Sequence, residues 1–156
     1  MDDLYLVIRD DILTAWNAGW TRTDVPVFWR SNQPLPDPDP LGGSGHEASA
    51  HFLRNEVDFG HEDIVGFGGG RHRNLRAQYG SVLLRTFSSL VVQDEDESLK
   101  LMSAAMAIFR SYRVTDSKGG DLSFIGTGSG FDSGPTEDGV WFMRGALAVF
   151  EYRFPG

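Results

Sequence analysis

The sequence predicts a single α+β domain in which a mixed or antiparallel sheet of about five strands is flanked by two helices, with long projecting loops. Three observations lead to this prediction. Two segments repeat apolar residues with the period of a helix, and several others alternate with the period of a strand. The chain has 156 residues, 40% of them hydrophobic, which suits one domain over residues 1–156. The expected order of elements is α-β-β-β-α-β-β.

The first expected element is an amphipathic helix over residues 4–16. Its apolar residues recur every four positions, as Leu4, Ile8, Ile12 and Trp16. Asp2 or Asp3 can cap its N-terminus, and Gly19 suits its end. A short strand is expected over residues 25–30. Pro26 has no amide to donate, so this strand lies at an edge of the sheet or begins at Pro26.

Two strands with long excursions are expected next. Proline at every second position from Pro34 to Pro40, followed by glycines, predicts an extended arm over residues 31–47. Strands are expected over residues 49–59 and 75–87, joined by a glycine-rich hairpin tip over residues 60–74. In the second of these strands Gly80 is expected at a bulge or bend. Its alternation predicts one apolar face, made of Leu75, Ala77, Tyr79, Leu83 and Phe87.

The second expected helix begins at an acidic run, Asp94-Glu95-Asp96-Glu97, where carboxylates favour the positive end of the helix dipole. A wide apolar arc follows, so this helix covers the sheet and can touch a second surface. Strands over residues 122–127 and 140–154 come last, joined by a Gly/Ser/Asp loop over residues 128–139. The last strand is apolar on both faces, which predicts a central strand covered on both sides.

The composition limits the classes of function. The chain has 22 acidic and 14 basic side chains, a formal charge of −8 and no cysteine. Disulfides, thiolate metal sites and cysteine nucleophiles are therefore excluded. The negative charge disfavours a protein that wraps nucleic acid, and no apolar run approaches the length of a membrane-spanning helix. We expect a protein made in the cytoplasm, with no membrane partner.

No convincing catalytic constellation is visible. His46-Glu47 and His51 resemble a zinc-binding HExxH motif, but the second histidine comes one residue too late to share a metal on a helix. His61-Glu62-Asp63 lacks a completing ligand, and neither Ser44 nor Ser129 fits a nucleophile elbow. The glycines of residues 66–70 lack the Lys-Ser/Thr of a phosphate-binding loop. We expect no catalysis, no metal and no cofactor.

What remains is a segregation of charge, typical of a subunit that meets neighbours. Arg71, Arg73 and Arg76 form the one basic concentration, which fits an acidic partner surface as well as it fits phosphate. The carboxylates at the start of the second helix are explained mainly by capping of that helix and by its dipole. The candidate interface or lumen residues are Arg71, Arg73, Arg76, Asp94, Glu95, Asp96, Asp132 and Asp138.

The order of elements and several local patterns resemble the tail terminator, or tail completion, proteins of long-tailed phages and of phage-derived gene transfer agents. The resemblance covers nearly the whole chain and rests on weakly specific motifs. They are the helix with Ile8-Arg9, Leu13 and Trp16, the strand Val27–Arg30, Arg76 with the segment Gly80–Phe87, the helix Leu99–Tyr112, and a last strand containing Gly139-Val140-Trp141-Phe142 and Phe150–Phe154.

The resemblance implies a virion structural protein of the tail or neck, assembled in the bacterial cytoplasm. Six copies would form a ring that caps the tail tube, stops its polymerisation and offers the head–tail joining surface. Its partners would be further copies of itself, the tail-tube protein and the head-completion or connector protein, with DNA only in transit through the lumen. Two alternatives stay open: another neck or tail-tube subunit of the same particle, and a small metal-dependent hydrolase or ligand-binding domain.

Overall fold

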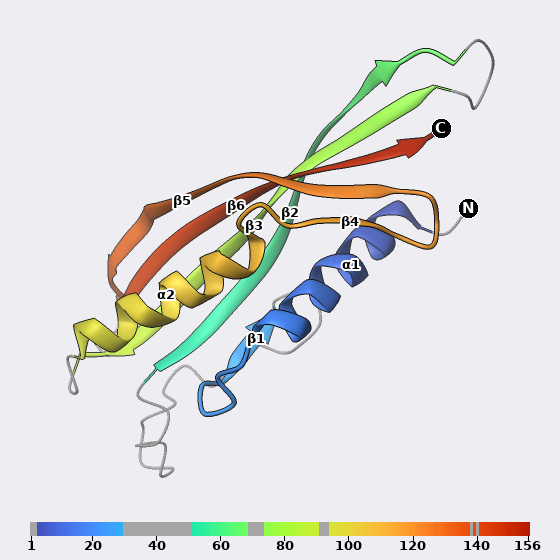
Figure 1. The fold of residues 1–156 in the computed structure, drawn as a ribbon. Helices are drawn as coiled ribbons and strands as arrows, with labels where there is room; N and C mark the ends of the chain where they lie inside the picture. Colours follow the sequence, from blue (N-terminus) through green and yellow to red (C-terminus); the bar gives the residue numbers. More distant parts are fainter. Residues whose placement is uncertain (1–2, 30–50, 69–73, 91–93, 138, 140) are drawn as a thin grey trace.

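The computed structural model describes residues 3–29, 51–68, 74–90, 94–137, 139 and 141–156. It shows an α+β fold in which two helices pack on one twisted sheet (Figure 1). The elements in chain order are α1 (Leu4–Gly19), β1 (Val27–Trp29), β2 (His51–Gly66), β3 (Leu75–Ser89), α2 (Glu95–Phe109), β4 (Arg113–Thr115), β5 (Asp121–Pro135) and β6 (Trp141–Pro155).

In the described residues the sheet has six strands, in the order β1-β2-β3-β6-β5-β4. Only the pair β1–β2 is parallel, and all other neighbouring strands are antiparallel. The α+β class is confirmed, but the expected number of about five strands is wrong by one, because β4 was not anticipated. Three residues are too few for an alternation to show in the sequence.

Two strands run much further than their sequence pattern predicts. β2 continues to Gly66 and β5 to Pro135, so residues 60–66 and 128–135 of the two predicted loops are strand. Long partner strands explain the difference, since β3 and β6 supply backbone hydrogen-bonding groups along the full length of both segments. The arm predicted over residues 31–47 lies outside the described residues.

Both helices begin with the expected local chemistry, and α1 runs through Gly19 to a C-cap at Trp20. The Asp3 carboxylate accepts a hydrogen bond from the Tyr5 amide at 3.0 Å, and α1 continues past residue 16 to Gly19. Asp94 caps α2 in the same way, accepting from the Glu97 amide at 3.1 Å. The cap predicted at Asp2 or Asp3 is therefore formed by Asp3.

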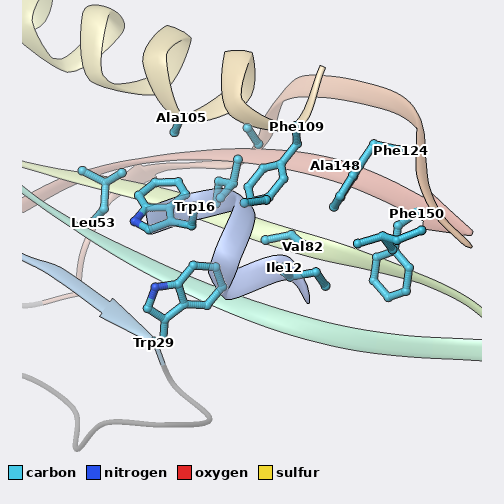
Figure 2. Packing of buried hydrophobic residues seen from close by; sticks show 14 of the residues in the cluster. Ile12, Trp16, Trp29, Leu53, Val82, Ala105, Phe109, Phe124, Ala148 and Phe150 are labelled. Carbon is cyan, nitrogen blue, oxygen red and sulfur yellow. The ribbon is translucent and has the colours of Figure 1, made fainter. Parts of the chain in front are cut away.

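The main core lies between the helices and one face of the sheet (Figure 2). Trp16 of α1 stacks with Phe109 of α2 at a ring separation of 6.1 Å, and Phe109 contacts Phe124 of β5 at 4.7 Å. Phe109 and Phe150 are fully buried. Large aromatic side chains therefore join both helices to the centre of the sheet.

The five residues predicted to share one apolar face of β3 do share a face, but it is the face turned away from the helices. Val82 and Leu84 are fully buried in the main core, whereas Leu83 is half-buried and Phe87 belongs to a separate aromatic cluster. Both faces of this strand carry apolar side chains, so alternation alone does not identify the face under the helices. Gly80 is not itself bulged, because the bulge lies in β2, between Phe59 and Glu62.

β6 is central, as predicted, but the helices cover only one of its faces. Ala146, Ala148 and Phe150 are fully buried on the helix side, while Leu147 and Val149 between them are half-buried. The expectation of a strand covered on both sides is therefore wrong for the single chain. β1 lies at the edge with Pro26 just before it, as predicted, and the Pro26 carbonyl accepts a hydrogen bond from the Leu53 amide at 2.9 Å.

Candidate interaction surfaces

The face of the sheet turned away from both helices is the first candidate surface, and we call it the open face. Alternation places on it Leu83 of β3 beside Leu147 of β6, and Ser81 beside Val149. The apolar side chains of Leu83, Leu147 and Val149 are half-buried. Because neither helix covers these apolar side chains, the open face is a candidate contact surface.

Charged side chains on the open face are mostly paired. Arg85 lies 3.6 Å from the Glu56 carboxylate, and Arg153 contacts Glu151. His61 lies 3.2 Å from Asp63 and stacks on the Tyr79 ring at 4.7 Å. Near-surface pairs of this kind contribute little stability.

One end of the open face is closed by an aromatic cluster. Phe52 stacks on Phe87 at 4.6 Å and meets the edge of Trp141 at 4.8 Å, and all three are buried. Phe28 and Met143 pack against them. The indole nitrogen of Trp141 is buried and has no hydrogen-bond partner among the described residues. The cluster therefore holds together the start of β2, the end of β3 and the start of β6, and no residue of either helix belongs to it.

The second candidate surface is the far end of the β2–β3 hairpin, which projects beyond both helices (Figure 1). We call this end the arm; it comprises the described residues among 60–79 and is distinct from the proline-rich segment predicted over residues 31–47. Apolar side chains are unusually exposed there, and Phe67 is 84% exposed. Ile64, Val65 and Leu75 are also exposed. Since exposed large apolar groups mark interaction sites, the arm is a candidate contact surface.

Arg76 lies on the arm and is held by its own chain. Its guanidinium is 3.4 Å from the Glu62 carboxylate and donates to the Gly156 carbonyl at 3.2 Å. Arg71 and Arg73 lie outside the described residues. The only described member of the predicted basic cluster is therefore placed on the arm, on the side of the sheet that carries the helices.

The acidic start of α2 lies on the helix side, far from the arm (Figure 1). Asp94 is the N-cap, and Glu95 forms an ion pair of 3.1 Å with Arg144 of β6. Glu97 contacts Arg22, which also pairs with Asp24 at 3.0 Å. Asp96 is exposed. These carboxylates cap the helix and tie it to β6 and to the segment before β1.

A hollow next to this helix start is lined by Ser88, Glu95, Ser98, Phe142 and Arg144. Its one lining cation is already engaged, because Arg144 also donates to the Ser98 hydroxyl at 3.2 Å and lies 5.0 Å from the centre of the Phe142 ring. An anionic ligand would have to displace these contacts, so the hollow is a weak ligand site.

The histidines do not gather ligands in the part of the chain that the structure describes. His51 is hydrogen-bonded to the Ser88 hydroxyl at 2.9 Å, and its burial lowers the pKa of the ring. Among the described residues, no three His, Asp or Glu side chains form a group that could hold a metal ion. His46 lies outside those residues.

A third arrangement was not foreseen. Asp11 of α1 is hydrogen-bonded to Asp116 in the turn before β5, and Tyr152 donates to Asp116 at 2.6 Å. Burial first, then the hydrogen bond and the charge of Asp116, raise the pKa of Asp11 to about 7. The helical pattern places Asp11 among polar residues, so no sequence signal links it to a residue more than a hundred positions away.

The structure thus separates the predicted candidate residues instead of gathering them. Arg76 lies on the arm, and Asp94, Glu95 and Asp96 lie at the start of α2. Asp132 lies within β5, and Asp138 is outside the described residues. The described acidic candidates at the start of α2 therefore lie on a different part of the molecule from Arg76.

Comparison with known proteins identifies the fold alone. No family model matches the chain, and no characterised protein matches its sequence. A solved structure of a protein whose name states no function aligns over 95% of this chain and 97% of its own, with 17% sequence identity and a TM-score of 0.59. Neither helix in the described part of the chain is long and apolar enough to cross a membrane.

Proposed function

We propose that this protein is a structural subunit of the tail terminator type. Six copies form a ring that caps a phage tail tube, stops its polymerisation and provides the surface for head joining, while DNA passes through the lumen. The observation that carries the proposal is the one-sided fold: both helices cover the same face of the sheet, and an arm with exposed apolar side chains projects beyond them.

A ring of identical subunits needs two different, complementary patches on each chain. The arm and the rest of the sheet supply unlike patches at separate places on this chain. The half-buried Leu83, Leu147 and Val149 of the open face supply a further apolar surface that no helix covers. The fold thus fits a subunit that completes its structure by assembly.

The charge of the chain fits passage of DNA without retention. With −8 on each chain, six copies carry a formal charge of about −48. If the open face lines the lumen, the acids at the start of α2 lie on the outside of the ring, because both helices pack on the opposite face of the sheet. Arg76 on the arm, together with Arg71 and Arg73 of the predicted basic cluster, would meet an acidic neighbour.

Another neck or tail-tube subunit of the same particle is the nearest competing function, because it would use the same surfaces. A metal-dependent hydrolase has less support. Such an enzyme needs a gathered ligand set, and the described histidines are engaged one by one, His51 with Ser88 and His61 with Asp63.

Mass measurement and negative-stain imaging of the purified protein, alone and with tail tubes, test the proposal. The expected result is a six-membered ring of tube width, bound at tube ends and limiting tube length. Incorporation along the whole tube would instead favour the tail-tube alternative. A strict monomer that binds zinc and ignores tube ends would overturn the proposal.

A further inference from the structure

Among the described residues, both outer edges of the sheet lack a partner strand over a long stretch. β1 pairs only with Leu53–Asn55, so among the described residues β2 has no strand on its outer side from Glu56 to Gly66. β4 pairs only with Asp121–Ser123, and the Phe124 amide bonds to the Tyr112 carbonyl. The outer side of β5 likewise has no strand beside it from Ile125 to Pro135 in the part of the chain that the structure describes. Each open stretch is eleven residues long.

We propose that neighbouring subunits join through these two edges, the open stretch of β2 in one copy pairing with the open stretch of β5 in the next. This inference rests on the proposed function only in taking the assembly to be a ring. Its occupant is a second copy of this chain, for four reasons that are visible in the structure: the positions of the steps, strand polarity, stagger and exposed apolar side chains.

The first reason is that the open stretches form complementary steps. Through the ladders, Glu56 aligns with Leu147 of β6 and Gly66 aligns with Pro155. The β5 stretch aligns lower, with Gly126 at Val149 and Pro135 at Phe142. β1 therefore occupies the part of one edge that is level with the start of β6. β4 occupies the part of the other edge that is level with the end of β6. A shift of about five residues, roughly 17 Å, brings the two steps into register.

The second reason is polarity. β2, β3, β6 and β5 alternate in direction, so β2 and β5 are antiparallel within one sheet. Copies related by rotation about a ring axis keep the same orientation, and β2 of one therefore meets β5 of the next in the antiparallel sense. Such a contact uses one edge of each kind per subunit, and closure of the ring leaves neither stretch open.

The third reason is that the stagger suits closure into a ring. Four strands per subunit span about 19 Å across the sheet at a spacing of about 4.8 Å. A stagger of roughly 17 Å over that width inclines the strands by about 40° to the ring axis, within the range of about 35–45° found in closed barrels. The tilt of the strands thus takes up the shift between neighbouring subunits. Successive subunits can therefore close into a flat ring and need not climb along a helical path.

The fourth reason is the placement of exposed apolar side chains. In the stepped register Gly66 lies opposite Ile125 of the neighbour. Val65 is 40% exposed, Phe67 84% and Ile125 59% in the single chain. A hollow lined by Arg110, Ser111, Phe124, Ile125, Gly126 and Thr127 lies beside the start of the β5 stretch. The pairing brings Phe67 of one copy to this hollow in the next, and all of these apolar groups leave water.

Cysteine cross-linking tests the inference on a clean background, since the chain has no cysteine. Asp63 and Gly128 lie on the open-face side of their strands and oppose each other in the stepped register. Asp63 is exposed, and nothing lies within 4 Å of a Cβ at Gly128. Asp63→Cys and Gly128→Cys variants are therefore expected to fold.

Mild oxidation of an equal mixture of the two variants should give a disulfide dimer, whereas neither variant alone should. Lys100→Cys, exposed on α2, replaces Gly128→Cys as the control and should give no dimer. Efficient cross-linking of Asp63→Cys with itself would mean a two-fold contact and overturn the inference. Absence of a cross-link in the mixture would overturn it as well, whether or not rings are seen.

The double variant with both cysteines in one chain separates this inference from the proposed function. A ladder of products that ends at six, seen as closed rings, supports both. A ladder without closed rings supports edge pairing and contradicts the ring function. Six-membered rings that do not cross-link leave the function standing and overturn the edge contact.

Discussion

Asp11 on α1 and Asp116 in the turn before β5 share a hydrogen bond between two carboxyl groups. Asp116 is also the organising residue of its turn: its Oδ1 accepts from the amides of Lys118 and Gly120, each at 2.9 Å. Burial disfavours its charge, but hydrogen bonds, first from Tyr152 and then from Asp11, lower the pKa of Asp116. The proton therefore resides on Asp11, where it links α1 to the sheet.

Because of the Asp11–Asp116 pair, we expect the free energy of unfolding to depend on pH near neutrality. An unfolded Asp loses its proton near pH 4, and folded Asp11 does so at about 7. Between these values the native state binds the extra proton, so the free energy of unfolding falls as the pH rises through this window. Urea unfolding from pH 5 to 8.5 should show the decline. The other charged groups near Asp11 are Asp10, Asp3 and Lys118.

The Asp11→Asn variant should remove this dependence, because an amide can donate to Asp116 without titrating. Its stability should change less between pH 5 and 8.5, and above pH 7.5 it should exceed that of the native chain. Asp10→Asn, on the exposed neighbouring residue, is the control and should keep the native slope. An equal slope in Asp11→Asn and the native chain would contradict the shared proton.

Gly80→Ala should destabilise the fold because of close packing at the centre of the sheet. A Cβ at this position would lie 2.4 Å from Phe150 Cζ and 2.5 Å from the Asp58 carbonyl oxygen. Overpacking of this kind costs about 1–3 kcal/mol, with the upper end expected where backbone is involved. Gly126→Ala is the matched control, since nothing lies within 4 Å of its Cβ. Equal unfolding midpoints for the two variants would refute this account.

Phe109→Ala should cause the larger loss that follows from a cavity in the main core. Phe109 is fully buried and contacts the rings of Trp16 and Phe124. The expected loss is about 3–5 kcal/mol, measured by denaturant unfolding. Leu99→Ala on the exposed face of the same helix should cost less than about 1 kcal/mol. A loss at Phe109 no greater than at Leu99 would show that α2 does not hold the core together.

Charge reversal of the three arginines tests the arm. Arg71, Arg73 and Arg76 changed together to Glu should impair ring formation or attachment to tube ends, while the thermal midpoint stays close to native because the described contacts of Arg76 are near the surface. Arg9→Glu, which replaces an exposed ion pair with Asp10 on α1, is the control. Normal assembly of the triple variant would exclude an acidic partner surface for the arm.

Local sequence rules succeeded where the cause is local. Asp3 and Asp94 cap their helices as predicted, because a side chain near the first turn can reach an unpaired amide. The long β3 strand and the edge position of β1 beside Pro26 were likewise predictable. The glycine-rich ends of β2 and β5 were not, since their strand structure depends on the ladders that β3 and β6 offer and not on their own side chains.

By itself, the sequence determined the two helices and their caps, the absence of cysteine chemistry, the negative charge and the α+β class, because each depends on composition or on spacing within a few turns. Only the tertiary structure decided which face of β3 and β6 lies under the helices, which edges stay open and that Asp11 meets Asp116. Those relations join residues far apart along the chain. They follow from how the whole sheet pairs and twists, which no local pattern specifies.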